Sequence, residues 1–360
     1  MHLKDEKFMR IAIGLAKKAE PLPNPRVGAV IVKNGKVIAT GYHHKAGEAH
    51  AEVNALRKLG KGEAKNSTIY VTLEPCSHYG RTPPCTKAIV EAGISRVVYA
   101  VEDPTRKVKG AEELKRAGIR VQGGILQKEA QVLNPAFYKV AKTGMPFVTL
   151  KSACSLDGKI ASKSGDSKWI SSPASRELAH WLRAKNEGII AGIGTVLQDN
   201  PRLTARLEGR RDPMRIILDS KLRIPLDAKA LAGGRAIIAA NKGCDKKKKE
   251  KLESMGVKVL LFSGKKIPLK PLLKKLAMLN ITSVLVEGGG ETNAGFVEEK
   301  LVDRYYFFVC PKIIGGRDAK SPVEGEGIVK ISKAQKLVFE KVEKIGTDVL
   351  IVAVPSPEKG

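Results

Sequence analysis

Apolar and polar positions in the first 145 residues alternate between the spacing of helices and the spacing of strands. Near the N-terminus, Phe8, Ile11 and Leu15 recur at helical intervals, which predicts a helix within residues 1–20. Asn34-Gly35 separates two apolar runs, and this pattern predicts a β-hairpin. Strands that alternate with helices indicate a layered α/β domain. The further expected elements are strands at 27–33, 36–42, 67–73, 96–101 and 119–122, and helices at 50–58, 85–92, 109–117 and 127–142.

The alternation restarts after Thr143-Gly144-Met145-Pro146, which we interpret as the boundary between a domain at 1–145 and a domain at 146–360. The chain is long enough for two separate cores. Its last part differs, because Arg304–Cys310 and Val349–Val354 favour strands without an obvious crossover helix between them. We expect an antiparallel terminal pair on an otherwise parallel sheet. The other expected elements are strands at 147–152, 188–191, 215–219, 235–239, 257–262 and 283–287, and helices at 172–186, 245–255, 268–279 and 291–299.

The formal net charge of +27 is large for a chain of 360 residues. Nucleic-acid binding would explain it, but the basic residues are spread along the chain and aromatic residues make up only 5%. We interpret the densest cluster, 245–251, as a solvated helix face, and phosphorylated small molecules as a milder reason for a positive field. The longest apolar run, Val349–Val354, is far short of a membrane span, and acidic residues near the start argue against a signal peptide. We therefore expect a cytoplasmic protein with neither nucleic-acid nor membrane partners.

Candidate chemistry in the first half centres on one histidine and two cysteines. His50, Cys76 and Cys85 can supply three protein ligands to zinc and leave a fourth position open, as catalytic zinc sites require. Glu52 lies two residues after the histidine, where a carboxylate can move protons without binding the metal. A His-x-Glu element followed by a Pro-Cys element is typical of the zinc-dependent nucleobase deaminases, which indicates that reaction class.

The spacing departs from the common form of this signature. The usual second element is Pro-Cys-x-x-Cys, whereas eight residues, 77–84, separate the two cysteines here. An alternative is that His50 and the cysteines are ordinary core residues, since such residues are often buried. The joint pattern argues against this, because both cysteines are placed to open helices, where thiolates are favoured. We interpret Cys154, Cys244 and Cys310 as packing or surface residues, with no disulfide framework expected.

The segment Thr72–Cys85, with the sequence TLEPCSHYGRTPPC, resembles the deaminase half of the bifunctional riboflavin-biosynthesis deaminase/reductase. Similar motifs occur at Asn24–Gly28, Ala46–Glu52, Ser155–Gly158 and Glu287–Gly290, so the resemblance covers nearly the whole chain. It implies an N-terminal cytidine-deaminase-like three-layer α/β/α domain. It also implies a C-terminal dihydrofolate-reductase-like α/β domain that binds NADPH, and a homo-oligomer that is a dimer or a tetramer.

Two expected strands of the second half run directly into glycines. Residues 284–287 precede Gly288-Gly289-Gly290, and residues 189–191 precede Gly192. Transitions of this kind at the carboxyl ends of strands favour a ligand crevice in an open α/β sheet, where glycines let backbone N–H groups approach a phosphate. A lone glycine triplet is nevertheless often a plain turn, and neither the dinucleotide fingerprint nor a Walker loop occurs.

The basic residues near this expected crevice suit a phosphorylated ligand. Lys151, Arg183 and Arg206 are sensible phosphate partners, although each could equally be a surface cation. Ser220 and the basic residues after it follow an expected strand and could meet the 2′-phosphate of NADPH. The sequence therefore favours NADPH over NADH only in combination with the resemblance.

The resemblance implies further site residues, which fall into three groups. Contacts to the pyrimidine or ribose in the deaminase would come from residues that could equally be loop residues, namely Asn24, His43, His78 and Asp103. Substrate contacts in the reductase would come from Lys151, Ser167, Arg183, Leu203, Arg206 and Glu287. Cofactor contacts would come from Ala153, Trp169, Thr195, Asp199, Ser220, Gly289, Gly290, Glu291, Thr292, Asn293, Ala294 and Gly295.

The resemblance, together with these observations, implies an enzyme of riboflavin biosynthesis with hydrolase and oxidoreductase activities. The first is zinc-dependent hydrolytic deamination of 2,5-diamino-6-(5-phosphoribosylamino)pyrimidin-4(3H)-one, with Glu52 moving the protons. The second is NADPH-dependent reduction of the ribosyl group to a ribityl chain. A nucleic-acid base deaminase would also explain the zinc residues and the charge, but not the second domain. A non-catalytic RNA-binding protein would explain the charge alone.

Overall fold

The computed structural model describes residues 2–80, 82–105 and 108–357. The chain divides into two compact units, unit 1 at Met1–Gly144 and unit 2 at Met145–Gly360. Each unit has its own sheet and its own buried core. Within the described residues, no helix has both the length and the apolar character needed to cross a membrane.

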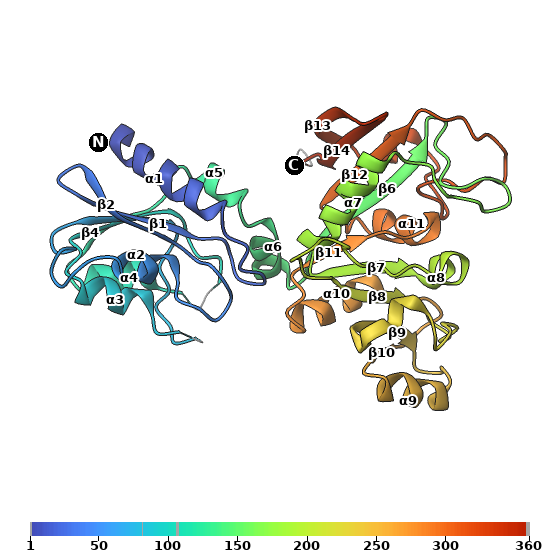
Figure 1. Ribbon diagram of the computed structural model, residues 1–360, viewed down its shortest axis with the longest axis horizontal. Helices are drawn as coiled ribbons and strands as arrows, with labels where there is room; N and C mark the ends of the chain where they lie inside the picture. The colour runs from blue at the N-terminus through green and yellow to red at the C-terminus, as the bar shows by residue number, and fades with distance from the viewer. Residues whose placement is uncertain (1, 81, 106–107, 358–360) are drawn as a thin grey trace. The chain divides into compact units, whose positions relative to one another are not determined.

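Unit 1 is built on a five-stranded sheet with the strand order β2-β1-β3-β4-β5 (Figure 1). β1 pairs antiparallel with β2 and β3, and β3, β4 and β5 run parallel. Asn34 and Gly35 both adopt positive φ, 51° and 74°, so the hairpin predicted from the Asn-Gly pair is confirmed. The strands are β1 Gly28–Lys33, β2 Lys36–Tyr42, β3 Thr68–Leu73, β4 Arg96–Val101 and β5 Arg120–Gln122.

Two glycines let helices approach both faces of this sheet. A Cβ at Gly28 would lie 2.1 Å from the carbonyl oxygen of Ala12 in α1 (His2–Ala16), and one at Gly41 would lie 2.3 Å from that of Ala51 in α2 (Ala51–Leu56). Gly28 pairs with Tyr42 and Gly41 with Ala29, so the two glycines point to opposite faces of the sheet. The first unit is therefore a three-layer α/β/α domain, as predicted. The other helices are α3 Cys85–Glu91, α4 Gly110–Arg116, α5 Gln127–Gln131 and α6 Pro135–Thr143.

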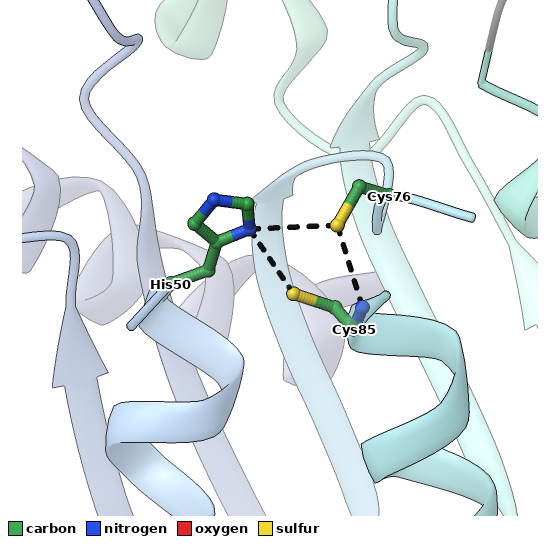
Figure 2. Close-up of side chains that lie close together, drawn as sticks. All are labelled: His50, Cys76 and Cys85. Atoms are coloured by element: carbon green, nitrogen blue, oxygen red, sulfur yellow. Dashed lines mark hydrogen bonds between the residues drawn. The ribbon is translucent and has the colours of Figure 1, made fainter. Parts of the chain in front are cut away.

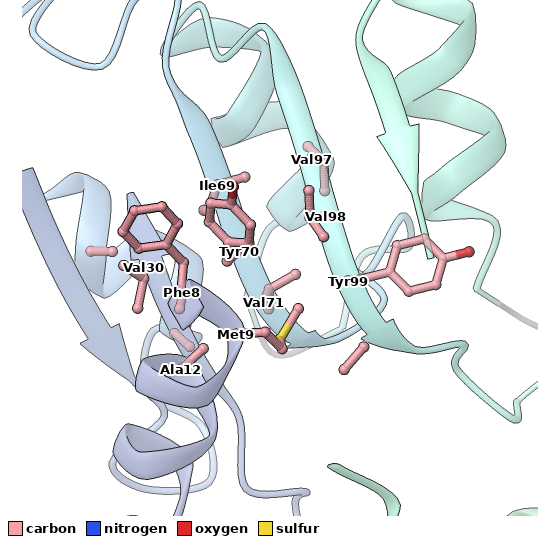
Figure 3. Close-up of a cluster of buried hydrophobic side chains, with 14 of the residues drawn as sticks. Phe8, Met9, Ala12, Val30, Ile69, Tyr70, Val71, Val97, Val98 and Tyr99 are labelled. Atoms are coloured by element: carbon pink, nitrogen blue, oxygen red, sulfur yellow. The ribbon is translucent and has the colours of Figure 1, made fainter. Parts of the chain in front are cut away.

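Figure 3 shows how the α1 layer is held to the sheet. Phe8 and Met9 of α1 are buried against β3, and the rings of Phe8 and Tyr70 lie 5.2 Å apart. The Tyr70 hydroxyl donates to Asp5 over 2.7 Å, and Arg96 donates to the same carboxylate over 2.9 Å. The buried carboxylate is thus paired and hydrogen-bonded, as a buried charge must be.

The prediction of one helix over residues 127–142 is wrong, because the structure has two helices there. α5 ends before Asn134, and α6 begins at Pro135, which lacks the backbone N–H that a continuing helix needs. The Asn134 amide instead accepts from the Arg26 N–H over 2.7 Å and donates to the Arg26 carbonyl over 2.9 Å. This long-range contact was not visible in the local pattern.

Unit 2 is built on a nine-stranded sheet with the order β10-β9-β8-β7-β11-β6-β12-β14-β13 (Figure 1). All neighbours from β10 to β12 are parallel, while β14 is antiparallel to both β12 and β13. The antiparallel terminal pair is confirmed, but β13 was not predicted. The strands are β6 Phe147–Ser155, β7 Gly188–Gly192, β8 Met214–Leu218, β9 Ala236–Asn241, β10 Lys258–Phe262, β11 Ser283–Val286, β12 Arg304–Cys310, β13 Leu337–Ile345 and β14 Asp348–Pro355.

Both faces of the central strands in unit 2 are covered. Ile216 and Ile217 follow each other along β8, point to opposite faces and are both fully buried. Strands buried on both faces read as continuous apolar runs, which explains why the sequence identified them well. A helix at 193–199 was not predicted, because Gly192 precedes it and Gly194 lies within it. The helices are α7 Pro173–Lys185, α8 Ile193–Asp199, α9 Lys246–Ser254, α10 Leu269–Met278 and α11 Gly290–Glu298, with 3₁₀ turns η1 Lys229–Gly234 and η2 Ile331–Lys333.

Candidate functional site

The sheet and two helices of unit 1 bring the predicted zinc ligands together (Figure 2). His50 is the residue before α2, Cys76 follows the end of β3, and Cys85 is the first residue of α3. The His50 Nδ1 lies 3.4 Å from the Cys76 Sγ and 3.3 Å from the Cys85 Sγ. All three ligand atoms lie within 4.8 Å of one another.

This donor set fits zinc. Tetrahedral zinc with ordinary Zn–S and Zn–N bonds places a nitrogen ligand about 3.6 Å from each sulfur ligand. The two N···S distances are close to this value, and among the described residues the cluster consists of these three ligands. The Cys85 backbone N–H also donates to the Cys76 Sγ over 3.3 Å, which helps to hold that sulfur as a thiolate. The three residues can therefore hold zinc with a fourth position free.

Contacts within the cluster shift the pKa values of its three residues and favour a thiolate at Cys76. The hydrogen bond from the Cys85 thiol lowers the pKa of Cys76 to about 4. The same contact, together with burial, raises the pKa of Cys85. The hydrogen bond to Cys76 raises the pKa of His50, although burial opposes this. One proton thus remains among two sulfurs, at the place where a metal would displace it.

Glu52 lies on the first turn of α2, beside the cluster and outside the ligand set. Its side chain is only 3% exposed, and its Oε2 has no hydrogen-bond partner among the described residues. Burial raises the pKa of Glu52, and the Cys76 sulfur raises it further. A buried carboxyl group with a free oxygen and a raised pKa is suited to carry a proton between a water and a bound ligand.

Asn24 and His43, two of the predicted substrate contacts, lie next to this cluster. His43 is buried, and its ring meets the ring of His50 edge-on at 5.1 Å between centroids. Its Nδ1 lies 3.1 Å from the Ala49 carbonyl, so this nitrogen donates. The Nε2 then accepts from the Asn24 Nδ2 over 3.0 Å. Burial lowers the pKa of His43, which favours the neutral ring that this network requires.

The other two predicted contacts of this half differ in exposure. His78 is exposed in the loop after Cys76, whereas Asp103 is half-buried. The Asp103 carboxylate accepts from the Thr105 N–H over 2.8 Å, which orients it at the end of β4. Burial raises the pKa of Asp103, and the hydrogen bonds from Thr105 oppose this.

A residue that the sequence analysis did not select, Glu74, joins the cysteine loop to the segment after β4. Its carboxylate accepts from the backbone N–H of Asp103 over 3.2 Å and from that of Ala111 over 2.9 Å. Gly110 lies against the same loop, since a Cβ there would be 1.9 Å from the Pro75 carbonyl oxygen. The sequence did offer one signal for Glu74, namely its position between a buried strand and the Pro75-Cys76 pair.

In unit 2, the structure brings Lys151, Arg183 and Glu287 together. The Arg183 guanidinium donates to both carboxylate oxygens of Glu287, over 2.8 and 2.7 Å. Leu150 and Val286 are partners in the parallel β6–β11 ladder. Lys151 and Glu287 are the next residues of the two chain segments, so they lie side by side at the same edge of the sheet. Burial lowers the pKa of Lys151, while the Glu287 carboxylate raises it and the Lys151 Nζ lies 5.6 Å from the Phe308 ring. Because Arg183 already binds both oxygens of Glu287, Lys151 shares that carboxylate, and an anionic ligand would suit this pair of basic residues.

Leu203 and Arg206 lie on either side of Thr204, whose carbonyl contacts Arg183, whereas Ser167 belongs to a separate segment. Leu203 is 3% exposed and belongs to an apolar core. Since its side chain has no polar atom, a polar contact with a ligand can come only from its backbone. Arg206 is exposed, and Ser167 is half-buried in the connection between β6 and α7. The Thr204 carbonyl accepts from Arg183 over 3.2 Å, which fixes the segment between Leu203 and Arg206.

A glycine cradle lies at the carboxyl ends of β7 and β11 and packs closely around the Thr292 side chain. A Cβ at Gly192 would be 2.4 Å from the Thr292 Oγ1, and one at Gly288 would be 2.4 Å from the Thr292 Cβ. Thr195 reaches the same place, since its Oγ1 is 3.9 Å from the Cβ position of Gly289. The buried Asn293 donates to the Pro322 carbonyl over 2.8 Å, and its Oδ1 has no partner among the described residues. This cradle opens α11, and a helix N-terminus is a favourable place for a phosphate.

The remaining predicted cofactor residues are spread over neighbouring elements. Trp169 is 62% exposed, with the Arg176 guanidinium 4.7 Å from its ring and its carbonyl accepting from Lys312 over 2.5 Å. Asp199 pairs with Lys168 over 3.4 Å. Neither Arg176 nor Lys312 was selected from the sequence, and Lys312 is 143 residues from Trp169 along the chain. Ala153 lies in β6, Ser220 follows β8, and Glu291, Ala294 and Gly295 lie in α11.

The comparison with known proteins covers both units. A family model described as the cytidine and deoxycytidylate deaminase zinc-binding region matches residues 2–101, and one described as the RibD C-terminal domain matches residues 146–351. The riboflavin biosynthesis protein RibD of Bacillus amyloliquefaciens is 44% identical over 99% of this chain and 97% of its own. That of Escherichia coli is 37% identical over 97% of this chain and 99% of its own.

Solved structures agree with the sequence relatives. Acinetobacter baumannii RibD, form 1, matches with a TM-score of 0.91 and 38% identity over 99% of this chain and 100% of its own. A diaminohydroxyphosphoribosylaminopyrimidine deaminase/5-amino-6-(5-phosphoribosylamino)uracil reductase from Thermotoga maritima matches with a TM-score of 0.83 and 34% identity over 99% of each chain. The predicted family and fold class are confirmed. The chain belongs to the RibD family of bifunctional riboflavin biosynthesis enzymes, in which a zinc-binding deaminase domain precedes a reductase domain.

Proposed function

We propose that this chain deaminates a diaminopyrimidinone that carries phosphoribosylamine and then reduces the ribosyl group of the product with NADPH. The observation that carries the first step is the cluster of His50, Cys76 and Cys85 beside the buried Glu52. The second step follows from the family and is supported by the basic cluster and the glycine cradle of unit 2. The Thermotoga maritima relative is named for the same two reactions.

In the deaminase, zinc held by His50, Cys76 and Cys85 would lower the pKa of a water molecule and so supply the nucleophile. Glu52 would accept a proton from that water and deliver it to the ring nitrogen, and would then take the second proton from the added hydroxyl group and deliver it to the departing amine. A carbon–oxygen bond forms, the carbon–nitrogen bond breaks, and ammonia leaves. The raised pKa of Glu52 suits both the acceptance and the return of the proton.

We assign substrate positioning in this half to four residues. Asn24 is oriented by His43 and keeps its amide oxygen for a polar ring atom. Asp103 and the exposed His78 lie after β4 and after Cys76, where a ribose phosphate attached to the ring would extend. Glu74 supports Asp103 through the backbone and does not itself face the ligand.

In the reductase, the bound NADPH supplies a hydride to the ribosyl carbon that is attached to nitrogen. Lys151 and Arg206 bind the phosphate of the substrate, and Arg183 holds Glu287 in place to accept from a sugar hydroxyl. Ser167 and the backbone of Leu203 complete the substrate contacts. The cofactor would be held by Thr195 and residues 289–295, by Ser220, whose position after β8 suits a 2′-phosphate, and by Ala153, Trp169 and Asp199.

The ligands we propose are small phosphorylated pyrimidines, and we propose no nucleic-acid or membrane partner. The chain would act as a homo-oligomer in the cytoplasm. All five cysteines are free, which suits a reducing compartment in which thiolates remain available to zinc.

Product analysis by mass spectrometry tests this proposal with the purified full chain. With the pyrimidine substrate alone, the expected product has lost its amino group as ammonia and keeps the ribosyl ring. When NADPH is added, that product gains one hydride and one proton. A diaminopyrimidinone that stays intact under both conditions, in zinc-loaded protein, would contradict the assignment. Retention of RNA that is lost on adding salt would instead favour the rival nucleic-acid function.

A further inference from the structure

The segment at 168–171, in the connection between β6 and α7, is held at one edge of the sheet in unit 2. β6, β7, β11 and β12 run parallel, so their carboxyl ends lie at the same edge. The Trp169 carbonyl accepts from Lys312, which follows the end of β12. Lys168 pairs over 3.4 Å with Asp199, the last residue of the helix that follows β7. The segment is therefore tied to elements that end or begin at the edge where the glycine cradle lies.

The indole ring of Trp169 is covered on one face by Arg176. This arginine lies in the first turn of α7, which leads from β6 back to the parallel strand β7, so the turn begins at the same edge of the sheet. Its guanidinium carbon is 4.7 Å from the ring centroid, and its Nη1 donates to the Ser171 carbonyl over 2.5 Å. A guanidinium over an aromatic face is attracted by the electrons of the ring. Trp169 is still 62% exposed, which leaves its other face open.

The order of the strands indicates which part of NADPH would reach this open face. β8, β7, β11, β6 and β12 are consecutive neighbours in the sheet (Figure 1). In the proposed binding mode, Ser220 after β8 meets the 2′-phosphate, and the glycine cradle at β7 and β11 meets the diphosphate. A cofactor that continues in the same direction would bring its nicotinamide ring to the ends of β6 and β12, where Lys312 holds Trp169.

We propose that Arg176 is a positioning residue for the reductase, which holds the Trp169 indole so that its open face stacks on the nicotinamide ring of NADPH. Arg176 acts through Trp169 and does not itself touch the reacting atoms. A ring that is held on one face and through its own backbone carbonyl has little freedom to turn. A nicotinamide stacked on it keeps its hydride directed at the ribosyl carbon. The inference rests on the proposed reaction with NADPH, which the reductase activity of the parent protein tests separately.

The rate of hydride transfer in a single turnover tests this role in the full chain, with the deaminated intermediate supplied directly. Arg176→Met keeps a long side chain but removes the charge, and it is expected to lower the rate roughly tenfold. Arg176→Lys keeps a cation near the ring and should recover most of that loss. Trp169→Leu should slow the reaction at least as much as Arg176→Met. Adding Arg176→Met to Trp169→Leu should change the rate by less than about twofold, because the contact no longer exists.

Quenching of Trp169 fluorescence by acrylamide reports on the ring without any turnover. The chain has two tryptophans, so Trp181→Phe leaves Trp169 as the only one, and Trp181 lies outside the proposed site. In that background, Arg176→Met should raise the quenching constant, because it uncovers the second face of the indole. The midpoint of urea unfolding shows whether each variant is folded. The Ser172 N–H is held by Asp348 over 2.7 Å, so the start of α7 should stay in place without Arg176.

Lys275→Met is the matched control for this substitution. Lys275 also lies over an aromatic ring, 4.5 Å from that of Phe262, and also donates to a nearby carbonyl, that of Leu261, over 3.3 Å. Its loss should change neither the reduction rate nor the quenching of Trp169.

The possible failures are distinguishable. A parent protein that does not oxidise NADPH would contradict the proposed function and this inference with it. An active parent whose rate is unchanged in Arg176→Met or in Trp169→Leu would overturn the inference alone. A slower Arg176→Met with unchanged quenching of Trp169 would also overturn it, because Arg176 would then act directly on the cofactor.

Discussion

Replacing Glu287 with glutamine should destabilise unit 2 strongly, because it leaves a buried guanidinium without its counterion. The side chains of Arg183 and Glu287 are only 14% and 10% exposed, and they form two parallel hydrogen bonds. Burial alone would raise the pKa of Glu287, but the Arg183 guanidinium outweighs it and lowers this pKa from 4.5 to about 2. At about 1.4 kcal/mol for each pKa unit, the ionised carboxylate contributes on the order of 3 kcal/mol to stability at pH 7.

The pH dependence of this contribution has a definite sign. Since the pKa is lower in the folded state, the stabilisation is complete above the unfolded pKa of 4.5 and is lost as the pH falls towards 2. The free energy of unfolding of Glu287→Gln should therefore be about 3 kcal/mol below that of the parent at pH 7. At pH 3 the difference should shrink to about 1 kcal/mol.

Tryptophan fluorescence during urea unfolding measures this difference in the right domain. The chain has two tryptophans, Trp169 and Trp181, and both lie in unit 2. Glu253→Gln is the matched control, because its exposed pair with Lys249 on α9 should contribute no more than about 0.5 kcal/mol. Equal stability of Glu287→Gln and the parent at pH 7, or a difference that is the same at pH 3, would refute the reasoning.

Three further predictions concern the two sites. Gly110→Ala should displace Pro75 and the neighbouring Cys76. Deaminase turnover should then fall on the order of a hundredfold, while reductase turnover stays at the parent value. Unchanged deaminase kinetics would show that the loop tolerates the added methyl group. Lys151→Ala should raise the reductase KM or lower its kcat and leave deamination intact, and unchanged reductase kinetics would remove Lys151 from the site. A fragment of residues 146–360 should bind NADPH in a fluorescence titration, provided that circular dichroism shows it to be folded. If the folded fragment has no affinity for NADPH while the full chain binds it, the cofactor site has been assigned to the wrong part of the chain.

The zinc cluster could be predicted from the sequence because each ligand occupies a position with a local signal. His50 precedes a helix, Cys76 follows a buried strand, and Cys85 opens a helix, and the structure brings all three together. The strands of unit 2 were predictable for a related reason, since burial on both faces makes them continuous apolar runs.

Elements held by long-range contacts could not be predicted in the same way. Pro135 was a local signal for the break between α5 and α6, but the hydrogen bonds that hold Asn134 at this break reach the backbone of Arg26, more than a hundred residues earlier. The support that Glu74 gives to Asp103 and Ala111 depends on two strands ending at the same edge. β13 carries charges at positions where alternation would place apolar residues, because the bulge changes the faces of its side chains.

The distinction between Glu52 as a proton carrier and Glu52 as a metal ligand tests the central claim most directly. Glu52→Gln keeps the shape of the side chain but cannot accept the proton, whereas Cys76→Ala removes a ligand. Metal analysis and deamination rates measured on both variants should give one zinc per chain and a rate lower by roughly 10²–10⁴-fold for Glu52→Gln, with loss of both zinc and deamination for Cys76→Ala. The Glu52→Gln protein should still reduce the deaminated intermediate when it is supplied directly. Deamination by Glu52→Gln at near the parent rate, or loss of its zinc, would contradict the role proposed for Glu52.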